Sequence, residues 1–198
     1  MNIQFRQTPN YTKSDGTKKI GFVLHGTAGA YNGAVEWLCN SQAQASAHYV
    51  IGRNEGEVIQ LVKEEDISWH AGIIKNPNER AKKVIPKNIL GQFKNPNMYF
   101  IGIEFAWGYD INKDGVINDL DKTLTEWQIN TAAQIMYDSG IYTYDTMLTH
   151  PEITTNRSDD ISSYFDAIDK RIAKLQDRKE TLTKEEIKSR IISLINQL

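Results

Sequence analysis

Short apolar runs alternate along this chain with segments of helical periodicity, and this alternation limits the folds open to it. The helical segments cover residues 33–45 and 125–140. We therefore expect an α/β fold, with a single mixed central β-sheet flanked by helices. The predicted strands cover residues 21–25, 48–52, 57–62, 98–106 and 146–150, and the second and third of them read as a hairpin.

The helix over 125–140 has clear boundaries, because Thr125 and Gln128 form a capping-box pattern and Gly140 provides a stop. Two further amphipathic helices are expected near the end of the chain, the second beginning after Thr183. We expect the first to pack on the sheet and the second to pack on the first or to meet another chain. The sequence thus predicts a main domain over 1–162 and a C-terminal helical extension over 163–198.

The composition is that of an ordinary globular protein, with 40% hydrophobic and 24% charged residues among 198. A net charge of -2 gives no reason to expect nucleic acid or a membrane as partner, and the oligomeric state stays open. No apolar run approaches the ~20 residues that cross a bilayer. Residues 1–7 contain no apolar core of a signal peptide, so cytoplasmic synthesis is expected.

The single cysteine, Cys39, allows no internal disulfide bond. It follows Val35, Trp37 and Leu38 on a short helical stretch, so we interpret it as a packed small apolar residue rather than a nucleophile.

Two histidines, His25 and His150, each end a strand-like run, and the carboxylate of Asp160 follows ten residues after the second. Two imidazoles and one carboxylate form a three-ligand zinc set that leaves a position open for water, as in catalytic sites. Glu104 ends another apolar run and is placed to act as a base toward that water. Spacing alone leaves open the alternative that both histidines are hydrogen-bonded structural residues.

A second metal site is predicted between residues 110 and 121, where the spacing of oxygen ligands fits a calcium loop with glycine at its sixth position. An aspartate rather than a glutamate stands at the twelfth position, and a solvated acidic turn is the alternative. The candidate calcium ligands are Asp110, Asn112, Asp114 and Asp121.

Six collinear motifs between about residues 18 and 162 resemble those of the zinc-dependent N-acetylmuramoyl-L-alanine amidases of the second type, which include phage endolysins, muropeptide-recycling amidases and peptidoglycan recognition proteins. The motifs are VLHGTAG from Val23, ASAHYVI from Ala45, ISWHAG from Ile67, IGIE from Ile101, LTEWQ from Leu124, and HPEI from His150 with RSDD from Arg157.

The resemblance implies an amidase catalytic domain over 1–162 that holds zinc through His25, His150 and Asp160. It also implies that Glu104 helps to activate water, and that His70 contacts substrate or stabilises the oxyanion, with a structural role as the alternative. His48 is expected to be structural or to support the residues that hold the metal.

Two departures from the family pattern matter. Ser158 stands where several relatives carry a lysine, so His70, Arg157 or zinc would have to stabilise the oxyanion. Asp159 is adjacent to Asp160, so the third ligand is open to an error of one residue.

The expected reaction is cleavage of the amide between N-acetylmuramic acid and L-alanine, with peptidoglycan or muropeptides as partners. A phage-type endolysin that acts on the cell wall after release is favoured over a cytosolic recycling enzyme. The sequence also leaves open a non-catalytic peptidoglycan-binding module and a calcium-dependent interaction protein.

Overall fold

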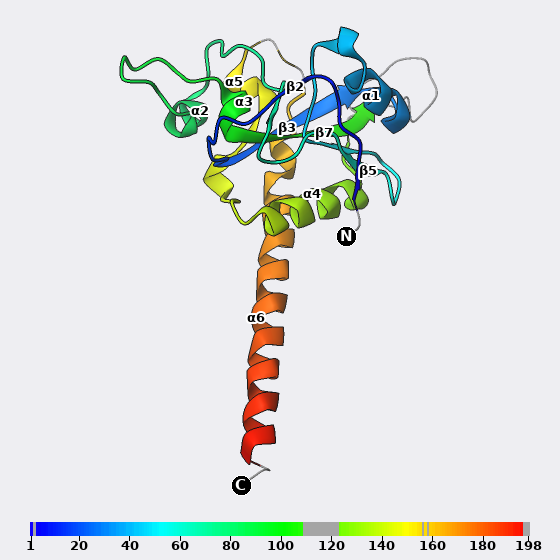
Figure 1. Ribbon diagram of the computed structural model, residues 1–198, viewed down its shortest axis with the longest axis vertical. Coiled ribbons are helices and arrows are strands. Elements are labelled where there is room, and N and C mark those ends of the chain that lie inside the picture. The colour runs from blue at the N-terminus through cyan, green and yellow to red at the C-terminus, as the bar shows by residue number, and fades with distance from the viewer. Residues whose placement is uncertain (2, 109–122, 156, 158, 196–198) are drawn as a thin grey trace.

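A mixed β-sheet forms the centre of the computed structural model, which describes all residues except 2, 109–122, 156, 158 and 196–198 (Figure 1). Within the described residues the sheet has six strands in the order β1-β5-β4-β7-β3-β8. Its strands are β1 (Gln4–Phe5), β3 (Gly21–Ala28), β4 (Tyr49–Ile51), β5 (Val58–Gln60), β7 (Phe100–Gly108) and β8 (Met147–Thr149). β2 (Tyr11–Thr12) and β6 (Ile67–Ser68) pair separately.

The central strands β4, β7, β3 and β8 run parallel to their neighbours, whereas β4 and β5 form the predicted antiparallel hairpin. The expected mixed sheet with flanking helices is therefore confirmed. β7 begins two residues later than expected because Pro96–Tyr99 forms the short helix α3, in which Pro96 occupies the first turn.

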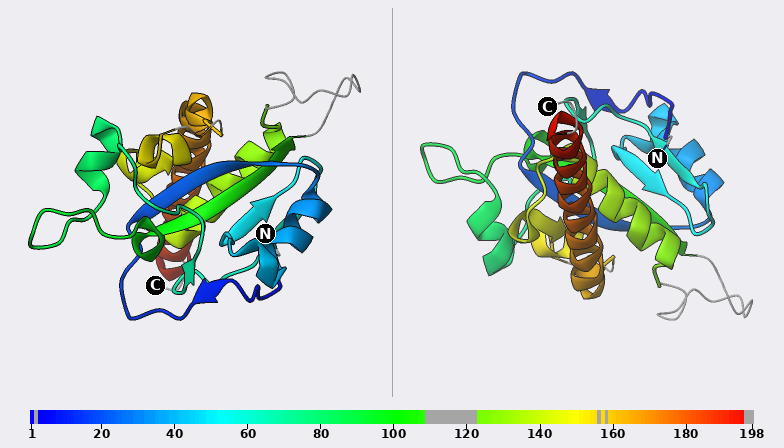
Figure 2. Two further views of the ribbon diagram at one scale, coloured as in Figure 1. Left: turned by 90° about the horizontal axis from the view of Figure 1, so that it is seen from above. Right: turned by 90° about the horizontal axis from the view of Figure 1, so that it is seen from below.

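One face of the sheet is covered by α4 (Glu126–Ser139) and the beginning of α6 (Phe165–Ile195), as both views of Figure 2 show. α4 has the expected boundaries, with the Thr125–Gln128 capping box and Gly140 in the left-handed conformation. Its apolar side packs against the large buried side chains of β3 and β7. This face is thus closed by the main core of the domain.

The opposite face carries shorter elements and is the more open one. α1 (Tyr31–Leu38) packs over β4 and β5 through Val35 and Leu38. α2 (Glu79–Val84) and α5 (His150–Ile153) pack beside Phe100. His150 therefore begins a helix rather than ending a strand, because Pro151 can occupy the first helical turn but cannot donate within a sheet.

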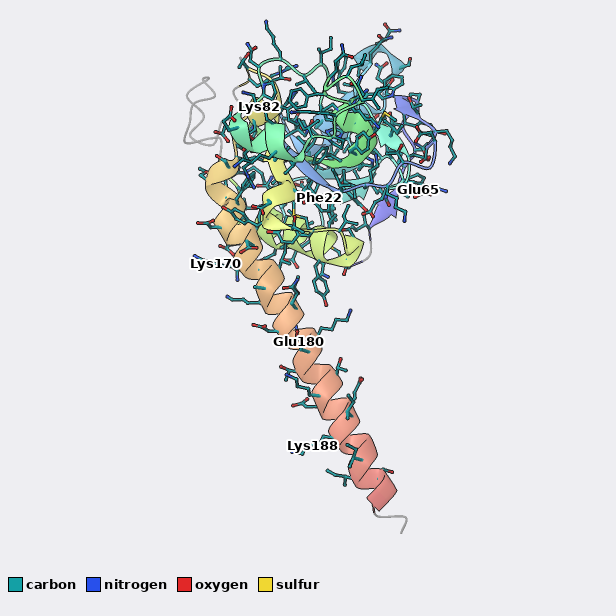
Figure 3. All side chains as sticks on the ribbon, turned by 90° about the vertical axis from the view of Figure 1, so that its left-hand side faces the viewer. Phe22, Glu65, Lys82, Lys170, Glu180 and Lys188 are labelled. Carbon is teal, nitrogen blue, oxygen red and sulfur yellow. The ribbon has the colours of Figure 1, made fainter. Side chains whose placement is uncertain are left out.

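The expectation of two C-terminal helices is wrong, since α6 is one continuous helix. No glycine or proline interrupts residues 165–195, and the hydroxyl of Thr183 donates to the carbonyl of Lys179 inside the helix instead of capping a new one. Ile168 and Ile172 are buried against α4, but the second half extends away from the domain, as the positions of Glu180 and Lys188 in Figure 3 show. Among the described residues, no helix is long and apolar enough to cross a membrane.

Candidate active site

The sheet order itself brings three of the candidate residues together on the open face. Strand β3 lies between β7 and β8, so His25 pairs in register with Glu104 on one side. On the other side Leu24 pairs with Thr149, which places His150 one residue beyond the end of β8. Registered residues of parallel strands project from the same face, so these side chains meet above the sheet.

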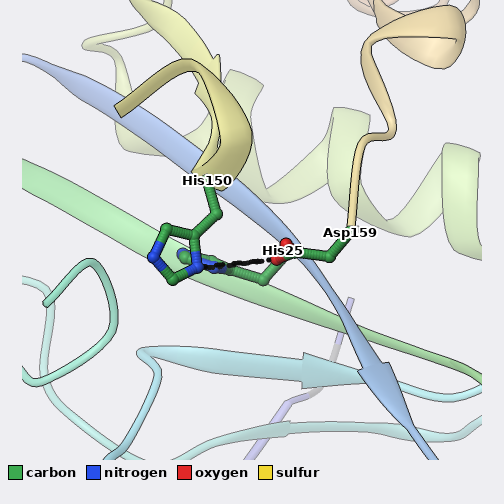
Figure 4. A group of neighbouring side chains, drawn as sticks. All are labelled: His25, His150 and Asp159. Carbon is green, nitrogen blue, oxygen red and sulfur yellow. Dashed lines mark hydrogen bonds and ion pairs between the residues drawn. The ribbon is translucent and has the colours of Figure 1, made fainter. Parts of the chain in front are cut away.

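The two histidines converge with an aspartate that comes from the segment leading to α6 (Figure 4). His25 Nδ1 lies 3.2 Å from His150 Nδ1, and Asp159 Oδ2 lies 3.6 Å from each of these nitrogens. Both histidines are buried, while the Asp159 side chain keeps 16% of its exposure. The three ligand atoms therefore form a small triangle with access from solvent.

The carboxylate in this cluster belongs to Asp159 and not to Asp160, which corrects the sequence-based expectation. Asp160 is exposed, and its Oδ1 accepts a hydrogen bond from the Ser162 N–H at 2.9 Å, at the start of a 3-10 helix over Ser162–Tyr164. Since the Asp160 side chain is engaged with Ser162, Asp159 is the aspartate that faces the histidines.

The triangle has the dimensions of a zinc site. In a tetrahedral site the distance between ligand atoms is about 1.6 times the bond length, so bonds of about 2.0–2.2 Å give separations of about 3.3–3.6 Å. The two separations of 3.6 Å in this cluster fall within that range, and the separation of 3.2 Å lies just below it. Two imidazoles and a carboxylate are also a ligand set that zinc accepts.

His70 lies behind His25 and connects it to the backbone of β7. His70 Nε2 lies 3.2 Å from the carbonyl oxygen of Phe100, and His70 Nδ1 lies 3.0 Å from His25 Nε2. Gly102 makes room for this ring, because a Cβ atom there would lie 2.5 Å from the Cγ atom of His70. Both nitrogens of His70 are thus engaged, which favours the structural alternative over a contact with substrate or an oxyanion.

This chain of contacts fixes the tautomer of His25. A carbonyl oxygen can only accept, so His70 Nε2 carries the hydrogen and His70 Nδ1 is an acceptor. His25 Nε2 must then donate to it, which leaves an unprotonated Nδ1 pointing at the cluster. Burial lowers the pKa of His25 and lowers that of His70 well below its usual range, so both rings are neutral.

His48 is structural, in agreement with expectation. Its Nε2 donates to the carbonyl of Asp66 at 3.1 Å, and its Nδ1 accepts from the hydroxyl of Ser68 and the N–H of Gly102. Burial lowers the pKa of His48 to about 3. The ring therefore holds three segments together as a neutral residue.

Glu104 is partly buried on β7, beside His25. Burial, together with the negative charge of Asp159, raises the pKa of Glu104 to about 8. Burial also opposes the charge of Asp159, but its interactions with His150 and His25 outweigh burial and lower the pKa of Asp159. The two carboxyl groups therefore differ in pKa. Glu104 can exchange protons near neutral pH, and Asp159 stays ionised.

The possible calcium ligands Asp110, Asn112, Asp114 and Asp121 fall outside the described residues, as does Ser158. Cys39 packs against the apolar cluster under α1, and burial raises the pKa of its thiol, as expected for a structural cysteine.

A buried residue that the sequence reasoning missed is Asn97, whose Oδ1 accepts from the N–H groups of His70 and Ala71. It holds the turn that presents His70. It lies in a polar stretch that also contains Lys94 and Asn95, so its residue type carried no distinctive signal.

The family model for N-acetylmuramoyl-L-alanine amidase matches residues 16–162, which include every residue of the cluster. The chain belongs to this family. The match covers strands β3 to β8, α4 and the segment that carries Asp159; it begins after β1 and β2 and ends before α6.

Known relatives agree with this assignment. N-acetylmuramoyl-L-alanine amidase A of Achromobacter lyticus is 34% identical over 96 residues, which are 48% of this chain and 41% of that protein. The chain thus matches less than half the length of this curated relative. A selenomethionine derivative of AmpD has a similar fold, with a TM-score of 0.57, 19% identity, and coverage of 84% of this chain and 93% of the other.

AmpDh3 from Pseudomonas aeruginosa, in complex with anhydromuramic pentapeptide, is 25% identical with a TM-score of 0.51. The similarity covers 79% of this chain and 58% of that one. The fold and the family are therefore shown, and the chemistry of the site rests on the geometry above.

Proposed function

We propose that this chain is a zinc-dependent amidase that cleaves the bond between N-acetylmuramic acid and L-alanine in peptidoglycan. The observation that carries the proposal is the triangle of His25 Nδ1, His150 Nδ1 and Asp159 Oδ2, whose sides fit a tetrahedral zinc site. When bound, zinc supplies a Lewis acid that polarises the amide carbonyl and lowers the pKa of water.

The protein's own groups divide the remaining work. His25 offers an unprotonated nitrogen because His70 holds its other nitrogen as a donor. Asp159 adds a negative charge, which the nearby histidines keep ionised. We assign His25, His150 and Asp159 as the ligands and His70 as a positioning residue for His25.

Glu104 is the group that moves the proton. Its carboxylate accepts a proton from the attacking water and delivers it to the nitrogen of the leaving L-alanine. Burial raises the pKa of Glu104, which makes its carboxylate a stronger base toward water than an exposed one. With His70 fully engaged, Arg157 or zinc itself would have to stabilise the oxyanion; Arg157 is exposed, and its charge reaches His25.

The substrate is peptidoglycan or a fragment of it, and a phage-type endolysin remains the favoured setting over a recycling enzyme. The AmpDh3 complex with anhydromuramic pentapeptide supports muropeptides as the substrate class. Comparison of rates on intact cell walls and on soluble muropeptides separates the two settings, since an endolysin should act on the walls.

The test is release of new L-alanine amino termini from purified peptidoglycan by zinc-stripped and zinc-restored protein. We expect release only after zinc is restored. Folded, zinc-loaded protein that binds peptidoglycan without releasing amino termini would instead identify a binding module.

The predicted calcium site stays a separate prediction, tested by calcium titration of the intact chain. Binding at millimolar calcium or below supports it, and no binding at millimolar calcium refutes it.

A further inference from the structure

A basic hairpin with an apolar tip extends from the edge of the domain between α2 and α3. We define it as residues 86–94, and Figures 1 and 2 show this segment extending away from the body of the molecule. Lys87 and Phe93 pair across it, and the Lys94 N–H donates to the carbonyl of Pro86 at 2.8 Å. None of the zinc-site residues lies on this segment.

The tip of the hairpin is a well-bonded turn. The Asn88 side chain accepts from the N–H groups of Leu90 and Gln92 and donates to the Gln92 side chain. Gly91 has a φ of 77°, the left-handed conformation that closes such a turn without strain. The hairpin therefore holds its two tip residues, Ile89 and Leu90, in a defined position.

These tip residues are unusual for a turn, where Asp, Asn, Ser and Gly are preferred. Ile89 is 101% exposed and Leu90 is 77% exposed. Ile73 is also 86% exposed, and it lines a hollow together with Phe93 of the hairpin. Large aliphatic side chains gathered in this way gain free energy when something apolar covers them.

The surrounding charge is strongly positive. Residues 73–97 contain six Lys and Arg and one Asp or Glu, whereas the whole chain has a net charge of -2. Arg80 is engaged by Glu152 and the Tyr144 carbonyl, and Lys82 pairs with Glu79. Among the described residues, no ion pair engages the lysines Lys75, Lys83, Lys87 and Lys94.

Three of the lysines in this region act on one acidic group, Glu79 on α2. Figure 3 shows α2 from this side of the molecule, with Lys82 labelled. The pKa of Glu79 is lowered by its hydrogen bond to Lys82 and by the charges of Lys82, Lys83 and Lys87. Lys87 also lies over the ring of Phe93, 4.8 Å from its centre. Positive charge and apolar surface are therefore contiguous on this part of the molecule.

We propose that the basic hairpin docks on the surface of an anionic lipid bilayer, with Ile89 and Leu90 entering the boundary between headgroups and acyl chains. An apolar insertion combined with lysines is the pair of signals that peripheral membrane binding requires. The lysine stems can lie along the apolar surface while their ammonium groups reach lipid phosphates. The proposal is independent of the amidase chemistry.

The observations favour a bilayer over two other occupants. An anionic polymer of sugar and phosphate would satisfy the lysines, but it offers no apolar environment to two aliphatic side chains. A second copy of the chain would have to bury about 800 Å² per partner, which a two-residue tip does not supply. The net charge of -2 gave no reason to expect a membrane partner, but it is a sum over the whole chain and hides the excess of positive charge in residues 73–97.

The test is sedimentation of the full chain with vesicles of equal parts phosphatidylglycerol and phosphatidylcholine, and with vesicles of phosphatidylcholine alone. We expect salt-sensitive binding to the anionic vesicles only. Ile89→Ser with Leu90→Asn keeps turn-favoured residues and should weaken binding by about tenfold or more. Lys83→Gln with Lys87→Gln should weaken it by about 25-fold, or about fivefold per lysine.

Matched controls remove the same chemistry from α6, where Ile187 and Ile191 are 55% and 51% exposed. Ile187→Gln with Ile191→Gln, and Lys184→Gln with Lys188→Gln, should bind vesicles like the unchanged chain. Every variant should also retain its unfolding temperature and its hydrolysis of soluble muropeptide, so that loss of vesicle binding reports the surface alone.

Three results would overturn the proposal. The first is absence of binding to anionic vesicles up to millimolar lipid. The second is loss of vesicle binding in the α6 variants while the hairpin variants bind vesicles like the unchanged chain. The third is unchanged vesicle binding in the hairpin variants, when these variants alter only binding to an anionic wall polymer or only self-association in sedimentation velocity.

Discussion

The two sides of the proposed zinc site are built in different ways. On the strand side, His25, Glu104 and His70 lie on or against adjacent parallel strands, and His25 is held through His70 to the Phe100 carbonyl. On the loop side, His150 begins a four-residue helix and Asp159 lies in an irregular segment. Within the described residues, the buried Nε2 of His150 has no hydrogen-bond partner, in contrast to that of His25.

The difference shows where precision comes from in this site. The strand side is oriented by hydrogen bonds that exist without metal, whereas the loop side depends on the cluster itself for part of its order. We therefore expect substitutions on the two sides to separate metal binding, turnover and stability.

The largest effect is expected at Asp159 on the loop side. Asp159→Asn removes the one negative ligand among the three. The variant should therefore not retain zinc supplied at one equivalent, and hydrolysis should be abolished. Asp160→Asn is the matched control, since Asp160 is exposed and only caps a turn, and it should change turnover by no more than about twofold. Zinc content by atomic absorption, measured beside the rate of L-alanine release, checks both. A reversed pattern would restore Asp160 as the ligand.

A large effect on turnover alone is expected at Glu104 on the strand side. Glu104→Gln keeps the shape of the side chain but cannot take a proton, so turnover should fall by about 10²–10⁴-fold while zinc content stays complete. Glu64→Gln is a suitable control, because Glu64 is a partly buried carboxylate bonded to the Tyr49 hydroxyl, away from the cluster. Near-normal rates in the Glu104 variant would exclude it as the base.

The same contrast explains what the sequence could predict. His25, Glu104 and the capped helix α4 follow from periodicity and end signals, because a strand or a helix fixes the direction of every side chain. Asp159 did not follow, since a one-residue shift in an irregular segment carries no periodic signal. The family resemblance located the third ligand within the motif at residues 157–160, but it did not identify which of the two aspartates faces the histidines.

Two further features needed the structure because they depend on non-local contacts. The role of His70 is set by the Phe100 carbonyl and by the space above Gly102, neither of which a local motif reveals. The single helix α6 replaced two predicted helices because Thr183 also fits the interior of a helix, and a capping pattern alone does not say which role a threonine takes.

An intermediate effect, on metal affinity, is expected at His70. His70→Leu removes the acceptor for His25 Nε2–H, so zinc affinity should fall by about 10–100-fold. His70→Asn places an oxygen near the position of the ring Nδ1 and should retain most of the affinity. His70→Gln places its amide near the other ring nitrogen, toward Phe100, and should lose zinc affinity as His70→Leu does. Competition with a chelator of known affinity measures all three, and equal losses in the three variants would reduce His70 to a packing role.

The smallest effect is expected on stability, at His48 below the strand side. Its pKa is lowered to about 3 by burial, whereas the unfolded chain titrates near the ordinary value of about 6.5. Between these values the unfolded state binds a proton that the folded state does not, so stability is present above pH 6.5 and falls as the pH drops. The slope from this one group is about 1.4 kcal/mol per pH unit.

Urea unfolding of zinc-stripped protein between pH 7 and pH 5 tests this contribution. His48→Asn keeps an acceptor for the Gly102 N–H and the Ser68 hydroxyl but has no group that titrates there. Over this range its stability should therefore fall by about 2 kcal/mol less than that of the unchanged chain, even if it is lower throughout. Parallel curves would mean that His48 is protonated in the folded protein. The strand side would then be less rigidly neutral than its hydrogen bonds indicate.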